Sequence, residues 1–146
     1  MIHHDVSHWP LAVVRVDSVP TTKENVLAFV TSQRAMLARR EPFIEVADAL
    51  DASVIPAVER RLLADWVKES NDQAKRLCVG VAVLVSSPII RGAMNAVLWI
   101  RSPEFPLHVC ATEHEAVTFL SRAAEDDGRI PEAPALLRSW SRRRTG

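Results

Sequence analysis

The sequence predicts an α/β fold in which helices pack on a mostly parallel sheet of four to five strands. Short β-branched segments alternate with amphipathic or capped helical segments along the chain. Alternation of this kind requires crossover helices on the faces of a parallel sheet. The length of 146 residues fits one domain with a substantial core.

The first strands and the first helix are marked by a break and by a capping pattern. Residues 11–16 form a β-branched run, and residues 2–8 are a candidate antiparallel edge strand before it. Thr21 and Glu24 have the spacing of a capping box, which predicts a helix over residues 22–40.

A second strand and helix follow. Residues 43–47 have strand character, and Pro56 is suited to the first turn of the next helix. Val58, Leu62 and Trp66 recur every four residues, which predicts an amphipathic helix over residues 56–77 with Trp66 in the core.

The second half of the chain repeats the pattern. Residues 79–85 are continuously apolar, as expected of a central strand covered on both faces. Thr112 and Glu115 form another capping box, and Gly128 suits a helix end. The remaining predicted elements are a helix over 88–100, a strand over 107–111 and a helix over 113–127.

The helix over residues 88–100 is apolar almost all round, with only Arg91 and Asn95 strongly polar. Such a helix either lies deep in the core or carries a second apolar face for a partner. We therefore predict partner contacts from Ile90, Arg91, Met94 and Trp99.

The zero formal net charge is a cancellation between two regions. Residues 1–128 hold 13 basic and 17 acidic side chains, whereas residues 129–146 hold 5 and 1. We predict one domain over residues 1–128 and a flexible, basic, Pro-containing tail over 129–146 that binds an acidic partner or folds back on the domain. Nucleic-acid binding is expected only through this tail. Its candidate interaction residues are Trp140, Arg142, Arg143 and Arg144.

Recognisable catalytic and cofactor motifs are missing. With only four glycines, neither a dinucleotide-binding fingerprint nor a P-loop can be formed. Cys78 and Cys110 fit buried apolar positions. His108, Cys110 and His114 lack a full ligand set. We predict no catalytic residue, no metal and no cofactor.

The loop after residue 47 holds the remaining polar candidates. Asp48 and Asp51 follow a strand, where ligands of parallel sheets bind, so a small enzyme using them with a histidine is one hypothesis. Ser53 precedes a helix, where a phosphate is favoured by the helix dipole, and it is either a phosphorylation site or an ordinary cap-region serine.

Several of these segments together resemble the SpoIIAA-like (STAS-like, STAS/SEC14) family of bacterial domains over roughly residues 1–125. They are the strand–helix–strand start with its acidic loop, the helix with Arg60, Arg61 and Trp66, the segment Ser87-Pro88-Ile89-Ile90-Arg91-Gly92, and the segment Ala111-Thr112-Glu113-His114-Glu115-Ala116.

The resemblance implies a mixed sheet flanked by helices and a regulatory or interaction module without catalysis. In anti-sigma-factor antagonists of this kind, a serine at the start of the second helix is phosphorylated. The comparable segment here, Asp51-Ala52-Ser53-Val54, has no glycine. The SEC14 comparison implies a lipid pocket.

We therefore expect a non-catalytic protein-interaction module of bacterial signalling, able to form a homodimer. The alternative is a module that binds a small anionic ligand or a lipid in a cavity between residues 79–85 and 88–100. Because no apolar run reaches the length of a membrane helix and no leader pattern opens the sequence, a cytoplasmic protein is expected.

Overall fold

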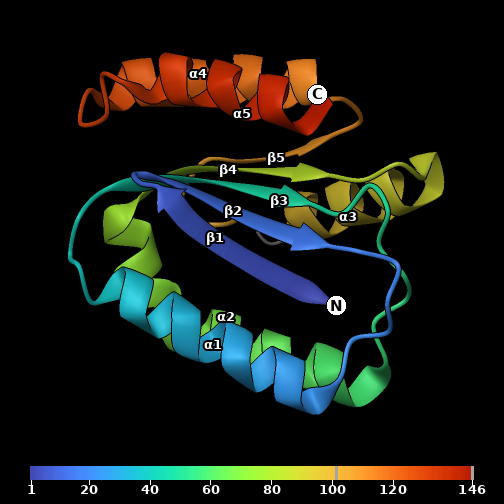
Figure 1. Cartoon of the computed structure of the whole chain (residues 1–146). Coiled ribbons are helices and arrows are strands. Elements are labelled where there is room, and N and C mark those ends of the chain that lie inside the picture. Colours follow the sequence, from blue (N-terminus) through green and yellow to red (C-terminus); the bar gives the residue numbers. More distant parts are fainter. Residues whose placement is uncertain (101, 146) are drawn as a thin grey trace.

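The described chain, residues 1–100 and 102–145 of a computed structural model, forms three layers around a five-stranded sheet (Figure 1). The strand order is β1-β2-β3-β4-β5; β1 is antiparallel to β2 and the other pairs are parallel. This confirms the predicted mixed α/β sheet. The strands are β1 Ile2–His8, β2 Leu11–Val16, β3 Phe43–Asp48, β4 Cys78–Leu84 and β5 Leu107–Cys110. The helices are α1 Lys23–Leu37, α2 Ala57–Leu77, α3 Pro88–Ile100, α4 Glu113–Asp127 and α5 Ala133–Thr145.

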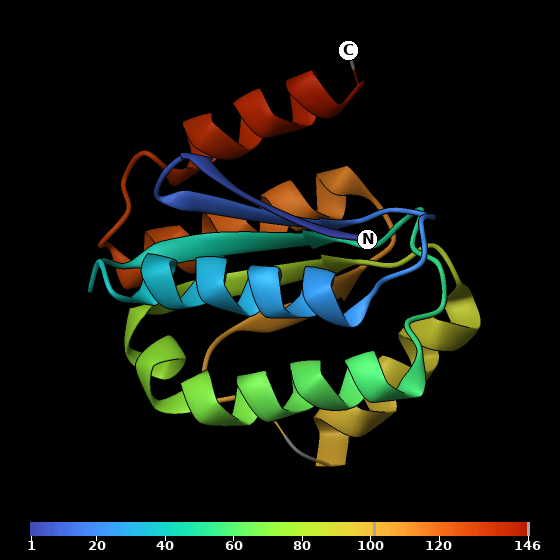
Figure 2. The ribbon, with the colours of Figure 1, turned by 60° about the horizontal axis from the view of Figure 1, so that its bottom comes forward.

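Each face of the sheet has its own apolar core. Helices α1 and α2 cover one face, and α4 and α5 cover the other, as Figures 1 and 2 show. Successive side chains of a strand point to opposite faces, so β3 supplies Phe43 to the α1/α2 side and Ile44 and Val46 to the α4/α5 side. Trp66 of α2 is buried on the α1/α2 side, as predicted.

The first helix begins one residue later than the predicted capping box. Thr22, not Thr21, is the N-cap, and its hydroxyl accepts a hydrogen bond from the backbone N–H of Asn25 at 3.2 Å. Thr21 is buried instead. The helix ends at Leu37, and Arg40 follows with a φ of 55°.

The ends of α4 follow the sequence signals. The hydroxyl of Thr112 accepts from the N–H of Glu115, and the carboxylate of Glu115 accepts from the N–H of Ala111 at 3.3 Å. Gly128 has a φ of 85°, a left-handed conformation that glycine adopts without steric cost.

The segment predicted to be a flexible tail is a helix packed on the domain. Ile130, Ala133 and Leu137 are almost fully buried and belong to the core under α4 and α5. Helix α5 contacts α4 and β2. The predicted flexibility was wrong, and of the two predicted roles, binding an acidic partner or folding back on the domain, the packing fits the second. The apolar positions recur every three to four residues, but five arginines and two prolines among residues 129–146 obscure this spacing in the composition.

Candidate functional site

Helix α3 carries the largest exposed apolar side chains of the described chain. Ile89 is 84%, Trp99 90% and Ile100 89% exposed. Ile90 is half exposed and Met94 is partly buried. Since large apolar side chains rarely gather on the surface of a monomer without a binding role, α3 is a candidate interaction surface. Of the two predicted placements, deep in the core or facing a partner, the exposures fit the second.

Polar contacts at its N-terminal end fix α3 to the sheet. The hydroxyl of Ser87 accepts from the N–H of Ile90 at 3.3 Å, as a cap does. The guanidinium of Arg91 donates to the carbonyl oxygens of Val85 and Ser86 at 2.7 and 2.9 Å. Arg91, predicted to contact a partner, therefore anchors α3 to the carboxyl end of β4.

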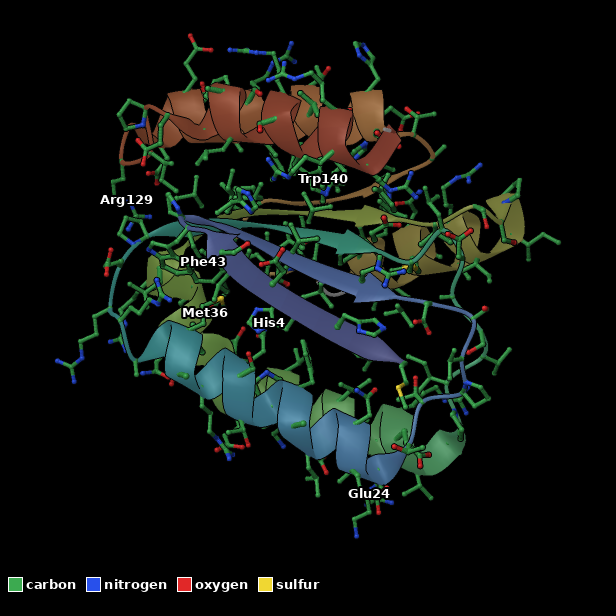
Figure 3. The ribbon with its side chains drawn as sticks, viewed as in Figure 1. His4, Glu24, Met36, Phe43, Arg129 and Trp140 are labelled. Carbon is green, nitrogen blue, oxygen red and sulfur yellow. The ribbon has the colours of Figure 1, made fainter. Side chains whose placement is uncertain are left out.

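The predicted interaction residues at the C-terminus differ in burial. Trp140 is only 6% exposed and points from α5 toward the sheet (Figure 3), so its predicted role in partner contact is wrong. Arg142 and Arg143 are exposed, and Arg143 donates to the hydroxyl of Ser139 on the same helix.

Arg144 forms an ionic cluster inside the domain. Its guanidinium lies 2.6 Å from a carboxylate oxygen of Asp48 and 2.6 Å from one of Glu113. The hydrogen bond to Asp48 is the main cause of a raised pKa of Arg144. Because Asp48 is 4% exposed, Arg144 compensates a buried charge and is not presented to a partner.

The same cluster bears on the enzyme hypothesis for the acidic loop. Asp48 is buried and paired with Arg144, whereas Asp51 is exposed. The partners that the described residues give to Asp48 are Arg144 and the N–H of Leu50, with no imidazole among them. This arrangement leaves the proposed carboxylate–histidine pair unsupported.

Ser53 lies in an irregular segment before α2. The N-cap of α2 is Pro56, so Ser53 is three residues upstream of it. Its N–H donates to the carbonyl oxygen of Asp17 at 3.3 Å, and its hydroxyl is buried with no hydrogen-bond partner among the described residues. A kinase could reach this hydroxyl only after the segment had moved.

A group with metal-ligand chemistry lies between β5 and the start of α4. The ligand atoms of His108, Cys110 and Glu115 all lie within 4.8 Å of one another, so Glu115 replaces His114 of the predicted spacing. Burial raises the pKa of Cys110 to about 11, and Glu115 is engaged in capping α4. Zinc is the metal that this set of ligands would suit. Cys110, however, is buried in the core, and Glu115 already caps α4.

A cavity of about 170 Å³ lies between α1, α2 and the sheet. Its described lining includes Val81 of β4 but no residue of α3, so it is not the cavity predicted between residues 79–85 and 88–100. Its polar lining residues are Gln33, Glu45, Ser70 and Asn71, and no Lys or Arg occurs among its described lining residues. This lining does not favour the small anion that the sequence suggested. The apolar lining residues are Phe29, Leu37, Phe43, Leu63, Trp66, Val67, Ala74, Cys78, Val81 and Phe105.

Glu45 is the residue of this cavity that the sequence analysis missed. It lies in the middle of β3 on the same face as Phe43, where a covered parallel strand normally places an apolar side chain. Burial raises the pKa of its carboxyl group to about 7, against a smaller opposite effect of the hydrogen bond from Gln33. A glutamate at an inward-facing position of a central strand was the available signal.

Comparison with known proteins supports the fold that this architecture defines, a SpoIIAA-like fold. A solved structure of an uncharacterized protein from the DUF3478 family, described as having a SpoIIAA-like fold and coming from Shewanella loihica PV-4, is similar to this chain. The TM-score is 0.62 at 12% sequence identity, and the match covers 82% of this chain and 92% of that one. The predicted resemblance is thus confirmed at the level of the fold.

Sequence comparisons gave no further relatives. No known family profile matches the chain, and no curated protein matches it. Among the described helices, none combines the length and the apolar character that a membrane crossing requires.

Proposed function

We propose that this protein is a non-catalytic protein-interaction module that docks through α3. The observation that carries the proposal is the exposure of Ile89, Trp99 and Ile100 on one helix. Aromatic and large aliphatic side chains of this kind contribute most of the binding energy at protein interfaces. The helix is also held in place by Ser87 and Arg91, so the docking surface is formed before the partner arrives.

A second copy of this chain is the occupant that we propose. Arg91 is the only charged residue of α3, and its guanidinium is occupied by two backbone carbonyls, so two copies of α3 meet without opposed charges. The zero net charge of the chain removes long-range repulsion between copies. A helix of 13 residues is about 20 Å long, enough to form the centre of a two-fold interface.

The proposal names no particular switch that regulates this contact. Phosphorylation of Ser53 is not part of it, because the hydroxyl is buried and lies outside α3. A role in bacterial signalling rests on the fold analogy alone.

Sedimentation velocity over a range of concentrations tests the proposal. We expect reversible dimers of the wild-type chain, and at least roughly tenfold weaker association for a Trp99→Ala/Ile100→Ala double variant. Leu27→Ala is the matched control, since Leu27 is a 49% exposed apolar residue on α1. Monomers of the wild type throughout, or equal weakening by Leu27→Ala, would contradict docking of a second copy through α3.

A further inference from the structure

The cavity under α1 and α2 combines an apolar wall with a single carboxyl group. Gln33 on α1 donates a hydrogen bond from Nε2 to Oε2 of Glu45 at 3.3 Å. Among the described residues, this is the only hydrogen bond given to the carboxyl group of Glu45, which leaves its other oxygen free to accept. A ligand that enters the cavity therefore contacts a hydrogen-bond acceptor, the free oxygen of Glu45, and mostly apolar side chains around it.

Residues beyond the cavity hold Gln33 in position. The same amide nitrogen of Gln33 lies 3.3 Å from Nε2 of His4, and Nδ1 of His4 lies 2.7 Å from the hydroxyl of Ser32. Figure 3 shows His4 on β1 facing α1. Burial lowers the pKa of His4, which favours the neutral imidazole, and in the tautomer with its proton on Nδ1 the Nε2 atom accepts from Gln33. The chain His4–Gln33–Glu45 thus fixes the free oxygen of Glu45.

Charged groups that face Glu45 are few. The titratable groups around it are His4 on β1, through Gln33, and Cys78 on β4, whose thiol pKa is raised by burial and by the charge of Glu45. From α2 the cavity receives the neutral Ser70 and Asn71. The guanidinium of Arg34 on α1 lies over the ring of Trp66, 5.1 Å from its centroid, and is paired with the exposed Glu69; neither Arg34 nor Glu69 is a lining residue. The described lining therefore supplies no cation to the Glu45 carboxylate.

We propose that this cavity binds a small apolar molecule carrying one protonated amine, with the ammonium group against the free oxygen of Glu45. A partly buried carboxylate without a cation is less favourable than one in water, and an ammonium group compensates it through a charge-assisted hydrogen bond. The cavity volume of about 170 Å³ suits a ligand on the order of eight non-hydrogen atoms, since an engineered apolar cavity of about 150 Å³ binds benzene. The site lies apart from α3, and its occupancy does not depend on docking there.

Three probes of similar size and different charge test the proposal: benzylamine, benzyl alcohol and benzoate. The full-length protein is titrated with each at about pH 8, where Glu45 is mostly ionised, and binding is followed by NMR at the Trp66 indole N–H and the Gln33 side-chain amide. We expect benzylamine to bind at least roughly tenfold more tightly than benzyl alcohol, and benzoate to bind most weakly. At about pH 5.5 the preference for benzylamine should fall, because Glu45 is then protonated.

Two variants locate the effect. Glu45→Gln keeps the shape of the side chain and should abolish both the preference for benzylamine and its pH dependence. Glu125→Gln removes the same charge at an exposed position of α4, on the opposite face of the sheet, and should leave both unchanged. If Glu45→Gln does not fold, the pH dependence of the preference for benzylamine in the wild type still tests the proposal. Equal affinities for the three probes, tightest binding of benzoate, or no shift at Trp66 and Gln33 would overturn the proposal.

Discussion

Helices α3 and α5 have the same length, but α3 exposes large apolar side chains whereas α5 buries them. Each has 13 residues, but α3 is apolar almost all round and α5 contains four arginines within the described residues. Yet Trp99 and Ile100 of α3 are exposed, whereas Leu137 and Trp140 of α5 are buried. Average hydropathy therefore does not decide which helix the domain covers.

Position along the helix explains the difference. Ala133, Leu137 and Trp140 of α5 form one stripe at helical spacing that faces α4 and the sheet, and Ile130, just before the helix, belongs to the same core. In α3 the apolar residues point in all directions, so a helix that contacts the domain on one side must expose the others. The comparison teaches that a narrow apolar stripe is sufficient for burial and that a surplus of apolar surface indicates a second contact.

The largest expected effect on stability is at α5, where it tests whether this helix is part of the core. Trp140→Ala should lower the free energy of unfolding by about 3–5 kcal/mol, because it removes a buried aromatic side chain and leaves a cavity. Arg138→Ala, an exposed position on the same helix, should change it by no more than about 0.5 kcal/mol. Urea unfolding measures both. Equal, small effects would mean that α5 is not part of the core.

The second prediction compares two carboxyl groups: Asp48, which is buried and paired with Arg144, and Glu45, which is partly buried and is paired with no described cation. Native Glu45 keeps its proton up to about pH 7, whereas the unfolded chain loses it near pH 4.5. The free energy of unfolding should therefore fall as the pH rises through this window, by up to about 3 kcal/mol.

Glu45→Gln should remove this part of the pH dependence, since a neutral amide has no proton to lose. Chemical unfolding at a series of pH values measures it, with Glu69→Gln as the control on the exposed side of α2. A profile of Glu45→Gln parallel to that of the wild type would contradict a raised pKa of an unpaired Glu45.

A somewhat smaller effect is expected at the ionic cluster that holds the end of α5. Arg144→Met keeps the hydrocarbon part of the side chain but leaves Asp48 buried without its cation, and should cost about 2 kcal/mol. Arg143→Met removes an exposed arginine one position away and should cost less than about 0.5 kcal/mol. Thermal unfolding of the two variants at one pH compares them, and similar costs would show that α5 is held by its apolar stripe alone.

The smallest effect on stability is expected at α3. Trp99 makes little contact with its own domain, so Trp99→Ala should change the unfolding free energy of the monomer by about 0.5 kcal/mol or less. Urea unfolding at low protein concentration measures it. A loss close to that of Trp140→Ala would mean that α3 is packed against the domain.

Much of the fold could be predicted because its signals are local. The bounds of α3 and α4, the cap at Thr112 and the left-handed Gly128 all follow from spacing and residue type. The N-cap was misplaced by one residue because Thr21 and Thr22 are both good caps, and only packing determines which of them is buried.

The candidate site could be predicted only in part, because much of it depends on contacts between segments far apart in the sequence. An exposed apolar helix can be inferred from α3 alone, but the burial of Trp140 depends on a stripe of a few apolar residues in a segment whose last turns are rich in arginine. The cavity at Glu45 depends on three elements far apart in sequence, β1, α1 and α2, which no local pattern brings together.

The central claim, that α3 is a docking surface for a second copy whereas α5 is part of the core, is tested most directly by hydrogen exchange at two protein concentrations. We predict that the protection of the α3 amides increases as the concentration rises, because dimers cover the helix, while the α5 amides are equally protected at both concentrations. Protection of α3 that does not change with concentration would contradict the claim.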